Sequence, residues 1–187
     1  MSTRKFLFFI LSVVGLFACH PNSQAPTDQN FSESSQVDNS IDIPEFAIPV
    51  LQSLTDSIKL DSSMVILGDF NADTREDMSA LIENKHNRKT GVIIIHNQQV
   101  PDFKIFGAGK TVNGIDDLAW IDIFQSIPNG DTITPTLVDS ISGDIIGPNL
   151  KKAFVLLGEG IFMHIDEASG GGIIFWDGEK YQWYHKE

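Results

Sequence analysis

The chain has little cysteine, little basic charge and no long apolar run, and each shortage excludes a class of protein. Cys19 is the only cysteine among 187 residues, so no disulfide can form within the chain and an apolar core must stabilise the folded part. The 13 Lys and Arg residues face 25 Asp and Glu residues, which gives a net charge of −12. Such a surface repels phosphate backbones and anionic headgroups, so we expect neither nucleic acid nor a peripheral membrane surface as a partner.

The longest apolar run, residues 6–17, lies at the N-terminus. It has about a dozen residues, whereas a helix needs roughly 20 to cross a bilayer. Arg4 and Lys5 precede the run and form the positive region of an export signal. We therefore expect residues 1–18 to be a signal peptide.

The signal ends in the sequence LFAC at residues 16–19, which resembles the bacterial lipobox. The resemblance implies that Cys19 is acylated, becomes the mature N-terminus and anchors the protein in a membrane. An ordinary secretory signal that is cut near Ala18 and leaves Cys19 as a free thiol is the alternative.

Residues 19–42 comprise Cys19 and a segment rich in Ser, Gln, Asn, Asp and Pro. So polar a segment cannot bury enough surface to offset its ordering entropy, so we expect a disordered tether. Without Arg4 and Lys5 the mature chain has 11 basic and 25 acidic residues, a net charge of −14. We expect a cell-envelope protein that is held by its lipid alone, at the periplasm-facing side of the outer membrane.

Residues 43–187 are long enough for one domain, and we expect them to form it. Pro49, followed by apolar residues at helical spacing through Ile58, predicts one short helix. After it come strand patterns, of which the β-branched run Gly91–His96 is the clearest. Leu118–Ile127 is apolar on both faces, and Thr132–Asp144 alternates weakly, as an edge hairpin would. The predicted fold is mainly β (α+β), an antiparallel sheet of about eight or nine strands with one short N-terminal helix.

The sharpest chemical pattern is GDFNADTRED at residues 68–77, which places oxygen-bearing side chains at every second position. Calcium takes about six to eight oxygen ligands, and such a loop can supply most of them from alternate side chains and one carbonyl. The predicted ligands are Asp69, Asn71, Asp73, the carbonyl of Arg75, and Asp77. A turn in which Asp and Asn accept bonds from backbone amides, without a metal, is the alternative.

The run ILGDFNAD at residues 66–73, with Asp77 following, resembles the FG-GAP or VCBS type of calcium loop. The resemblance implies a structural calcium ion between two strands, held by the acidic and amide side chains just named. Ala72 and Thr74 stand where that family usually has glycine, and a β-branched residue is a poor occupant of a position with positive φ. An EF-hand does not fit, because Thr74 and Ala80 stand where it needs glycine and glutamate.

The C-terminal segment, IIFWDGEKYQWY at residues 173–184, predicts a hairpin. Trp176, Tyr181 and Trp183 share one of its faces. That face either packs into the core or forms an exposed aromatic platform for a sugar ring or a protein. Together with the lipobox, this ending resembles an uncharacterised group of small bacterial lipoproteins that carry one FG-GAP-like loop.

A second polar cluster, HIDEAS, occupies residues 164–169. In a continuous strand, His164 and Asp166 would share a face and could exchange a proton, with Glu167 nearby. No nucleophile elbow surrounds Ser169, and no second histidine stands at metal-ligand spacing, so a polar hairpin loop is the simpler interpretation.

These patterns favour a non-enzymatic, lipid-anchored envelope protein with a structural calcium ion and a surface for a protein or glycan partner. Two alternatives remain open. One is a periplasmic inhibitor or immunity-like lipoprotein whose acidic surface covers a basic partner. The other is a hydrolase that uses His164 with Asp166 or Glu167.

Overall fold

The computed structural model describes residues 42–168 and 170–186, and residues 38–187 form one compact unit. In the described residues, twelve strands pair antiparallel in four sheets and one short α-helix packs beside them. The expectation of a mainly β, antiparallel fold with one short helix is confirmed. The expected single sheet of eight or nine strands is wrong, because the strands divide between two four-stranded sheets and two two-stranded ribbons.

The first sheet contains four consecutive strands in the order β1-β2-β3-β4. Their bounds are β1 Ile58–Gly68, β2 Asp77–Asn84, β3 Thr90–His96 and β4 Asp102–Gly107. In β3, Val92 and Ile94 face the second sheet, whereas Ile93 and Ile95 face the helix, and all four are fully buried. A strand that is covered on both faces gains from apolar residues at every position, which explains why GVIIIH does not alternate.

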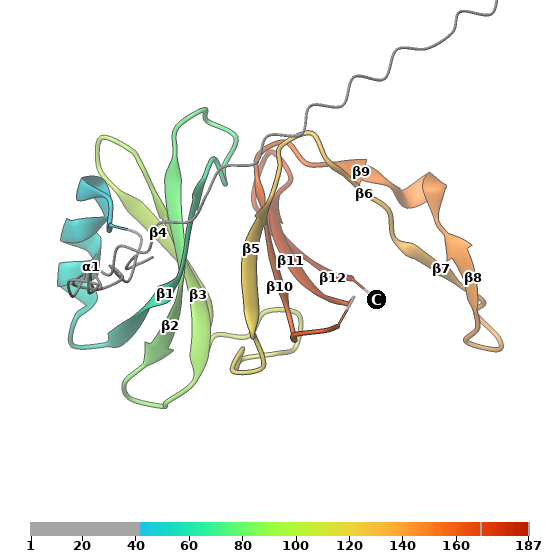
Figure 1. The fold of residues 1–187 in the computed structure, drawn as a ribbon, viewed down its shortest axis with the longest axis horizontal. Helices are drawn as coiled ribbons and strands as arrows, with labels where there is room; N and C mark the ends of the chain where they lie inside the picture. The colour runs from blue at the N-terminus through green and yellow to red at the C-terminus, as the bar shows by residue number, and fades with distance from the viewer. Residues whose placement is uncertain (1–41, 169, 187) are drawn as a thin grey trace, which may run out of the picture. The chain divides into compact units, whose positions relative to one another are not determined.

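The second sheet has the order β12-β11-β10-β5, so its strands come from the C-terminal part of the chain. Their bounds are β5 Ile123–Ile127, β10 Gly160–His164, β11 Gly171–Trp176 and β12 Tyr181–Lys186. The two sheets face each other in Figure 1, with a shared core that includes Phe70 and Leu81 from one side and Met163 and Ile174 from the other. This part of the fold is a β-sandwich.

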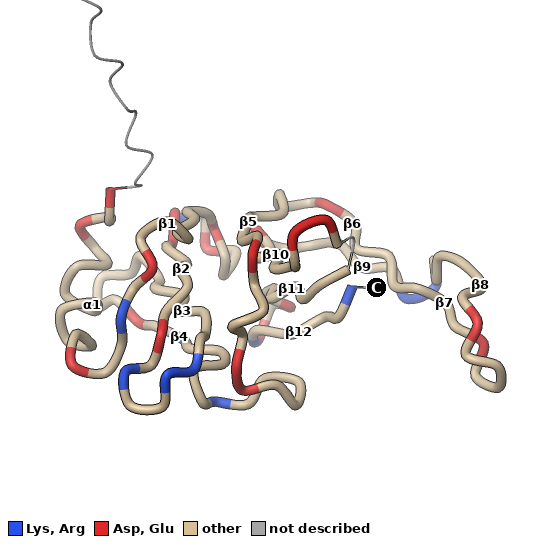
Figure 2. Tube along the Cα trace, turned by 60° about the horizontal axis from the view of Figure 1, so that its bottom comes forward, with Lys and Arg blue, Asp and Glu red and all other residues tan. Residues whose placement is uncertain are grey.

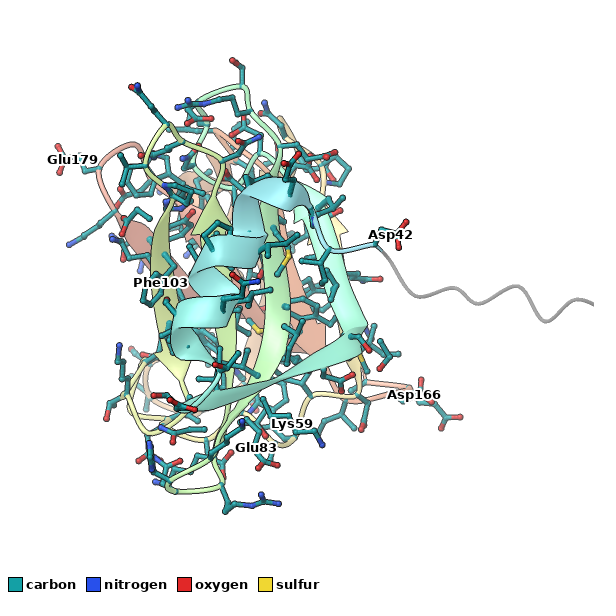
Figure 3. The ribbon with its side chains drawn as sticks, turned by 90° about the vertical axis from the view of Figure 1, so that its left-hand side faces the viewer. Asp42, Lys59, Glu83, Phe103, Asp166 and Glu179 are labelled. Carbon is teal, nitrogen blue, oxygen red and sulfur yellow. The ribbon has the colours of Figure 1, made fainter. Side chains whose placement is uncertain are left out.

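The helix α1, Ile48–Leu54, lies on the outer face of the first sheet (Figures 1 and 3). A 3-10 turn, η1 Glu45–Ala47, leads into it, and Pro49 occupies its first turn, where a missing N–H costs no hydrogen bond. Ala47 and Val50 are buried against Met78 and Ile93 in a second core between helix and sheet. The helical pattern was predicted to continue to Ile58, but that residue begins β1.

Residues 128–157, which we call the arm, make up most of the connection from β5 to β10 and form two ribbons beside the sandwich (Figure 1). The ribbon nearer the sandwich pairs β6 Thr132–Ile133 with β9 Phe154–Val155. The farther ribbon pairs β7 Thr136–Val138 with β8 Ile145–Pro148, and a 3-10 turn, η2 Leu150–Lys152, leads back from it. The edge hairpin predicted over Thr132–Asp144 is wrong, because both strands of that segment pair with later residues.

The strand predicted over Leu118–Ile127 begins only at Ile123. Leu118 is fully buried and belongs to the core between the sheets, but it lies in the segment before the strand. Apolar residues on both faces of this segment therefore reflect a packed loop, followed by a strand. Asp122 is exposed and accepts a hydrogen bond from the amide of Asp166 at 3.2 Å, so it does not carry a buried charge.

Candidate functional site

The candidate calcium loop connects two paired strands of the first sheet. β1 ends at Gly68, β2 begins at Asp77, and these two residues are opposite each other in the ladder. The side chains between them turn toward the loop's own backbone. Asp69 accepts bonds from the amides of Asp73 at 3.0 Å and Thr74 at 2.8 Å, and Asp73 accepts one from the amide of Arg75 at 3.0 Å. The loop is thus wound around its acidic side chains.

Ala72 and Thr74 adopt the left-handed backbone that glycine would occupy more easily. Their φ angles are 62° and 69°. A left-handed conformation costs a non-glycine residue roughly 1–2 kcal/mol. The loop therefore keeps its left-handed residues at a cost in backbone strain, because Ala72 and Thr74 stand where glycine would adopt this conformation freely.

Asp77 is the most unusual of the predicted ligands because it is fully buried. Its Oδ1 accepts a bond from the amide of Asn97 at 2.8 Å, whereas its Oδ2 is buried and has no hydrogen-bond partner among the described residues. Burial raises the pKa of Asp77 to about 7, the nearby charges of Asp73 and Asp69 add to the rise, and the amides of Asn97 and Phe70 partly oppose it. An unpartnered carboxyl oxygen among other carboxylates is a position that a cation would stabilise.

Arg75 supplies positive charge to the loop through its side chain. Its guanidinium donates to Oδ2 of Asp73 at 2.7 Å, and this hydrogen bond is the main reason that the pKa of Asp73 is lowered. The side chain of Arg75 is half exposed, so this ion pair is screened by solvent. The loop pattern predicts only a carbonyl ligand from Arg75 and does not indicate that its side chain is an internal counter-charge.

Within residues 42–168 and 170–186, no three His, Cys, Asp or Glu side chains are already arranged to hold a metal ion. The carboxylates of Asp69 and Asp73 are directed at loop amides and at Arg75. Carboxylate oxygens keep further lone pairs when they accept one N–H bond, so these contacts leave acceptor capacity for a cation. The oxygen atoms of the loop have the chemistry that calcium requires, and the guanidinium of Arg75 already binds one of them, Oδ2 of Asp73.

A turn from the second sheet packs directly on the loop. The amide of Glu159 donates to the carbonyl of Asp69 at 2.7 Å. A Cβ on Gly158 would lie 2.5 Å from that same carbonyl, and one on Gly68 would lie 2.6 Å from a carboxyl oxygen of Glu159. Gly158 is needed because a side chain there would meet backbone, whereas at Gly68 the flexible side chain of Glu159 could move aside. Sequence gave no sign of this contact, since 90 residues separate Asp69 from Glu159.

The two sheets are also joined by a hydrogen bond close to the loop. His96, at the end of β3, lies 2.8 Å from the hydroxyl of Tyr181 on β12, measured from its Nε2, and the two rings stack. Burial lowers the pKa of His96, whereas burial and then the charge of Asp77 raise the pKa of Tyr181. His96 was not among the predicted site residues.

The aromatic face of the C-terminal hairpin lies on the inner side of the second sheet. Tyr181 and Trp183 are partly buried against the core between the sheets, and Trp176 meets Tyr181 edge to face with ring centroids 5.1 Å apart. Trp183 also lies across Gly172, where a Cβ would come within 2.2 Å of the indole ring. The sequence leaves open whether this face packs into the core or forms an exposed platform. Tyr181 and Trp183 pack against the core.

The proposed acid–base cluster is not assembled by hydrogen bonds in the described part of the chain. β10 ends at His164, whose Nδ1 lies 2.9 Å from the carbonyl of Ile165 and whose ring stacks on Phe162. Asp166 and Glu167 are exposed in the following turn, and Asp166 points away from the fold in Figure 3. Ser169 lies outside the described residues.

The predicted lipidation site Cys19 and the predicted signal peptide, residues 1–18, also lie outside the described residues. Among the residues described, no helix is long and apolar enough to cross a membrane. No protein-family model matches the chain, and neither a curated protein nor a solved structure matches it.

Proposed function

We propose that the loop from Asp69 to Asp77 binds one structural calcium ion. The observation that carries this proposal is the buried Oδ2 of Asp77, which has no partner in the described structure although it lies close to the charges of Asp69 and Asp73. Leaving a buried charge without a partner costs several kcal/mol, so the site favours either a proton or a cation.

The chain would hold the ion with the side chains of Asp69, Asn71, Asp73 and Asp77 and the carbonyl of Arg75. Bound calcium would supply positive charge to the cluster and leave the chemistry of the chain otherwise unchanged. Arg75 would then leave Oδ2 of Asp73, because a cation and a guanidinium compete for the same oxygen. Because the turn at Glu159 packs on the loop, the ion would also stabilise a junction between the two sheets.

We propose further that the protein is a non-enzymatic, lipid-anchored module of the bacterial envelope that presents its folded part to a protein or glycan partner. The lipobox-like residues 16–19 support the anchor. Among the described residues no hydrogen bond joins His164 to the exposed carboxylates of Asp166 and Glu167, and this gives no support to a hydrolase.

The test of calcium binding is the melting temperature of the unit Asp38–Glu187, with excess calcium and with a chelator. A ligand that binds only the folded state adds about 2.7 kcal/mol at 100 times its dissociation constant, which is roughly 5–10 °C for a domain of this size. Isothermal titration with calcium measures the stoichiometry directly, and we expect one ion for each chain.

Asp69→Ala removes one ligand and should abolish the calcium-dependent shift. Asp166→Asn is the matched control, because it removes an exposed carboxylate outside the loop and should leave the shift unchanged. If calcium and chelator give the same melting temperature for the unaltered protein, the loop is a hydrogen-bonded turn and the proposal is wrong.

A further inference from the structure

The arm carries most of the exposed aliphatic surface of the described chain. Among residues 42–168 and 170–186, twelve large apolar side chains are exposed, and eight of them belong to the arm. These eight are Leu137, Val138, Ile141, Ile145, Ile146, Leu150, Val155 and Leu157. Single exposed apolar residues are ordinary on a protein surface, but a concentration of this kind marks an interaction surface.

The farther ribbon of the arm lacks the packing that usually stabilises a sheet. β7 and β8 pair only with each other, through three opposed residue pairs, so each strand has one open edge. An isolated two-stranded ribbon is marginally stable in water, and three or more strands are generally needed. A further strand would supply backbone hydrogen bonds to the open edge and cross-strand neighbours for the apolar side chains.

The base of the arm is fixed to the sandwich, so the exposed part is held in a defined place. Phe154 stacks on Phe175 of β11 with ring centroids 4.6 Å apart, and Leu156 is almost fully buried. Beyond this base, Ile145 is 71% exposed, and Ile141, in the turn between β7 and β8, is 96% exposed. The apolar surface is thus concentrated in the part of the arm beyond its base.

The amount of exposed surface suits a stable contact with another macromolecule. The exposed fractions of the eight side chains together equal about five whole aliphatic residues, or roughly 800 Å². One partner contributes about this area to an interface of standard size, and a β8–β8 contact would use the part of it that lies on β8 and in the turn before it.

Charge indicates which partner fits. The arm contains three acidic and two basic residues, a net charge of −1, whereas the rest of the described chain contains 18 acidic and nine basic residues, a net charge of −9. Figure 2 shows the acidic positions distributed along both sheets and their loops. A basic partner would be attracted to the sandwich and not to the arm. Two copies of this chain, in contrast, repel least where their arms meet.

We propose that the arm pairs with the arm of a second copy of this chain, through antiparallel association of β8 with β8 about a two-fold axis. β8 is the better edge because Ile145 and Ile146 are 71% and 61% exposed, whereas Leu137 and Val138 of β7 are 38% and 39% exposed. Two ribbons would then form one four-stranded sheet. Such an interface uses the same surface on both partners, as two-fold dimers require.

Self-association is tested with the full chain, solubilised in detergent, by sedimentation equilibrium over a range of protein concentrations. We expect a monomer–dimer equilibrium. Ile145→Ser with Ile146→Ser should weaken dimerisation at least tenfold, because central apolar contacts contribute most of the affinity of an interface. Val100→Ser is the matched control, since Val100 is 79% exposed and lies outside the arm, and it should leave the dissociation constant unchanged.

Oxidative cross-linking locates the contact. Under the proposed symmetry, Ile146→Cys lies near the two-fold axis and should form a disulfide-linked dimer rapidly, whereas Val100→Cys should not exceed the background that the unaltered chain shows through Cys19. A chain that stays monomeric at every concentration overturns the proposal, as does equal cross-linking of the two variants.

Discussion

Replacing Asp77 by asparagine should remove most of the dependence of stability on pH in calcium-free protein. The pKa of Asp77 is about 7 in the folded state, compared with about 3.9 for an aspartate in the unfolded chain. Because the folded-state pKa is the higher one, the stability is fully present below about pH 4 and is lost as the pH rises through 7. The loss amounts to about 4 kcal/mol.

Other ionisable groups lie near Asp77. The difference in free energy of unfolding between the unaltered protein and Asp77→Asn is therefore more informative than the value for either protein alone. The nearby groups are Asp69, Asp73 and Arg75 of the loop and Tyr181 of β12. Beyond them, His96 of β3 contacts Tyr181, and Glu159 of the docked turn lies beside Gly68. His96 acts in the opposite direction, because its lowered pKa costs stability as the pH falls below about 6.5. Subtracting the stability of Asp77→Asn from that of the unaltered protein at each pH cancels this contribution.

The measurement is urea unfolding at pH 5, 6, 7 and 8 in the presence of a chelator. We expect the unaltered protein to lose stability relative to Asp77→Asn across this range, by about 3 kcal/mol. Repeating the series in excess calcium should abolish the trend, because a bound cation stabilises the ionised carboxylate. A difference that is constant from pH 5 to 8 in the chelator would refute the assignment of a buried, unpartnered carboxyl group to Asp77.

Two further substitutions test the geometry around the loop. Thr74→Gly should raise the free energy of unfolding by about 1 kcal/mol, because glycine adopts a φ of 69° without strain. Urea unfolding should detect this gain. A loss of stability would show that the left-handed turn is not retained. Tyr181→Phe should lower the free energy of unfolding by about 1–3 kcal/mol, since the buried ring of His96 loses its hydrogen-bond partner. An unchanged midpoint of urea unfolding would contradict a hydrogen bond between the sheets.

The sequence predicts the individual strands of this fold better than their assembly. β3 begins one residue before the predicted range Gly91–His96 and ends with it, because its β-branched residues determine the local conformation. The division into two sheets could not be predicted, since a residue such as Leu81 or Ile161 is apolar whichever sheet lies opposite. Leu118 misled the prediction for the same reason, because burial in a loop and burial in a strand require the same kind of side chain.

Much the same limit applies to the candidate site. The spacing of Asp69, Asn71, Asp73 and Asp77 follows from a local pattern, and the structure places all four in one loop. Glu159 and Tyr181 join the loop from segments far along the chain, which only the packing of the two sheets brings close. The complete burial of Asp77 likewise depends on the second sheet and has no signature in the neighbouring residues.

The arm leaves the sandwich and returns to it at one point, because Ile127 at the end of β5 and Gly160 at the start of β10 are directly opposite each other. The 32 residues between them therefore span a gap that a tight turn could close. Shortening such a connection to about four residues would change its closure entropy by only about 2 kcal/mol. The length and surface of the arm beyond its packed base can consequently change with little effect on the ladder beneath it, so one scaffold can carry arms suited to different neighbours.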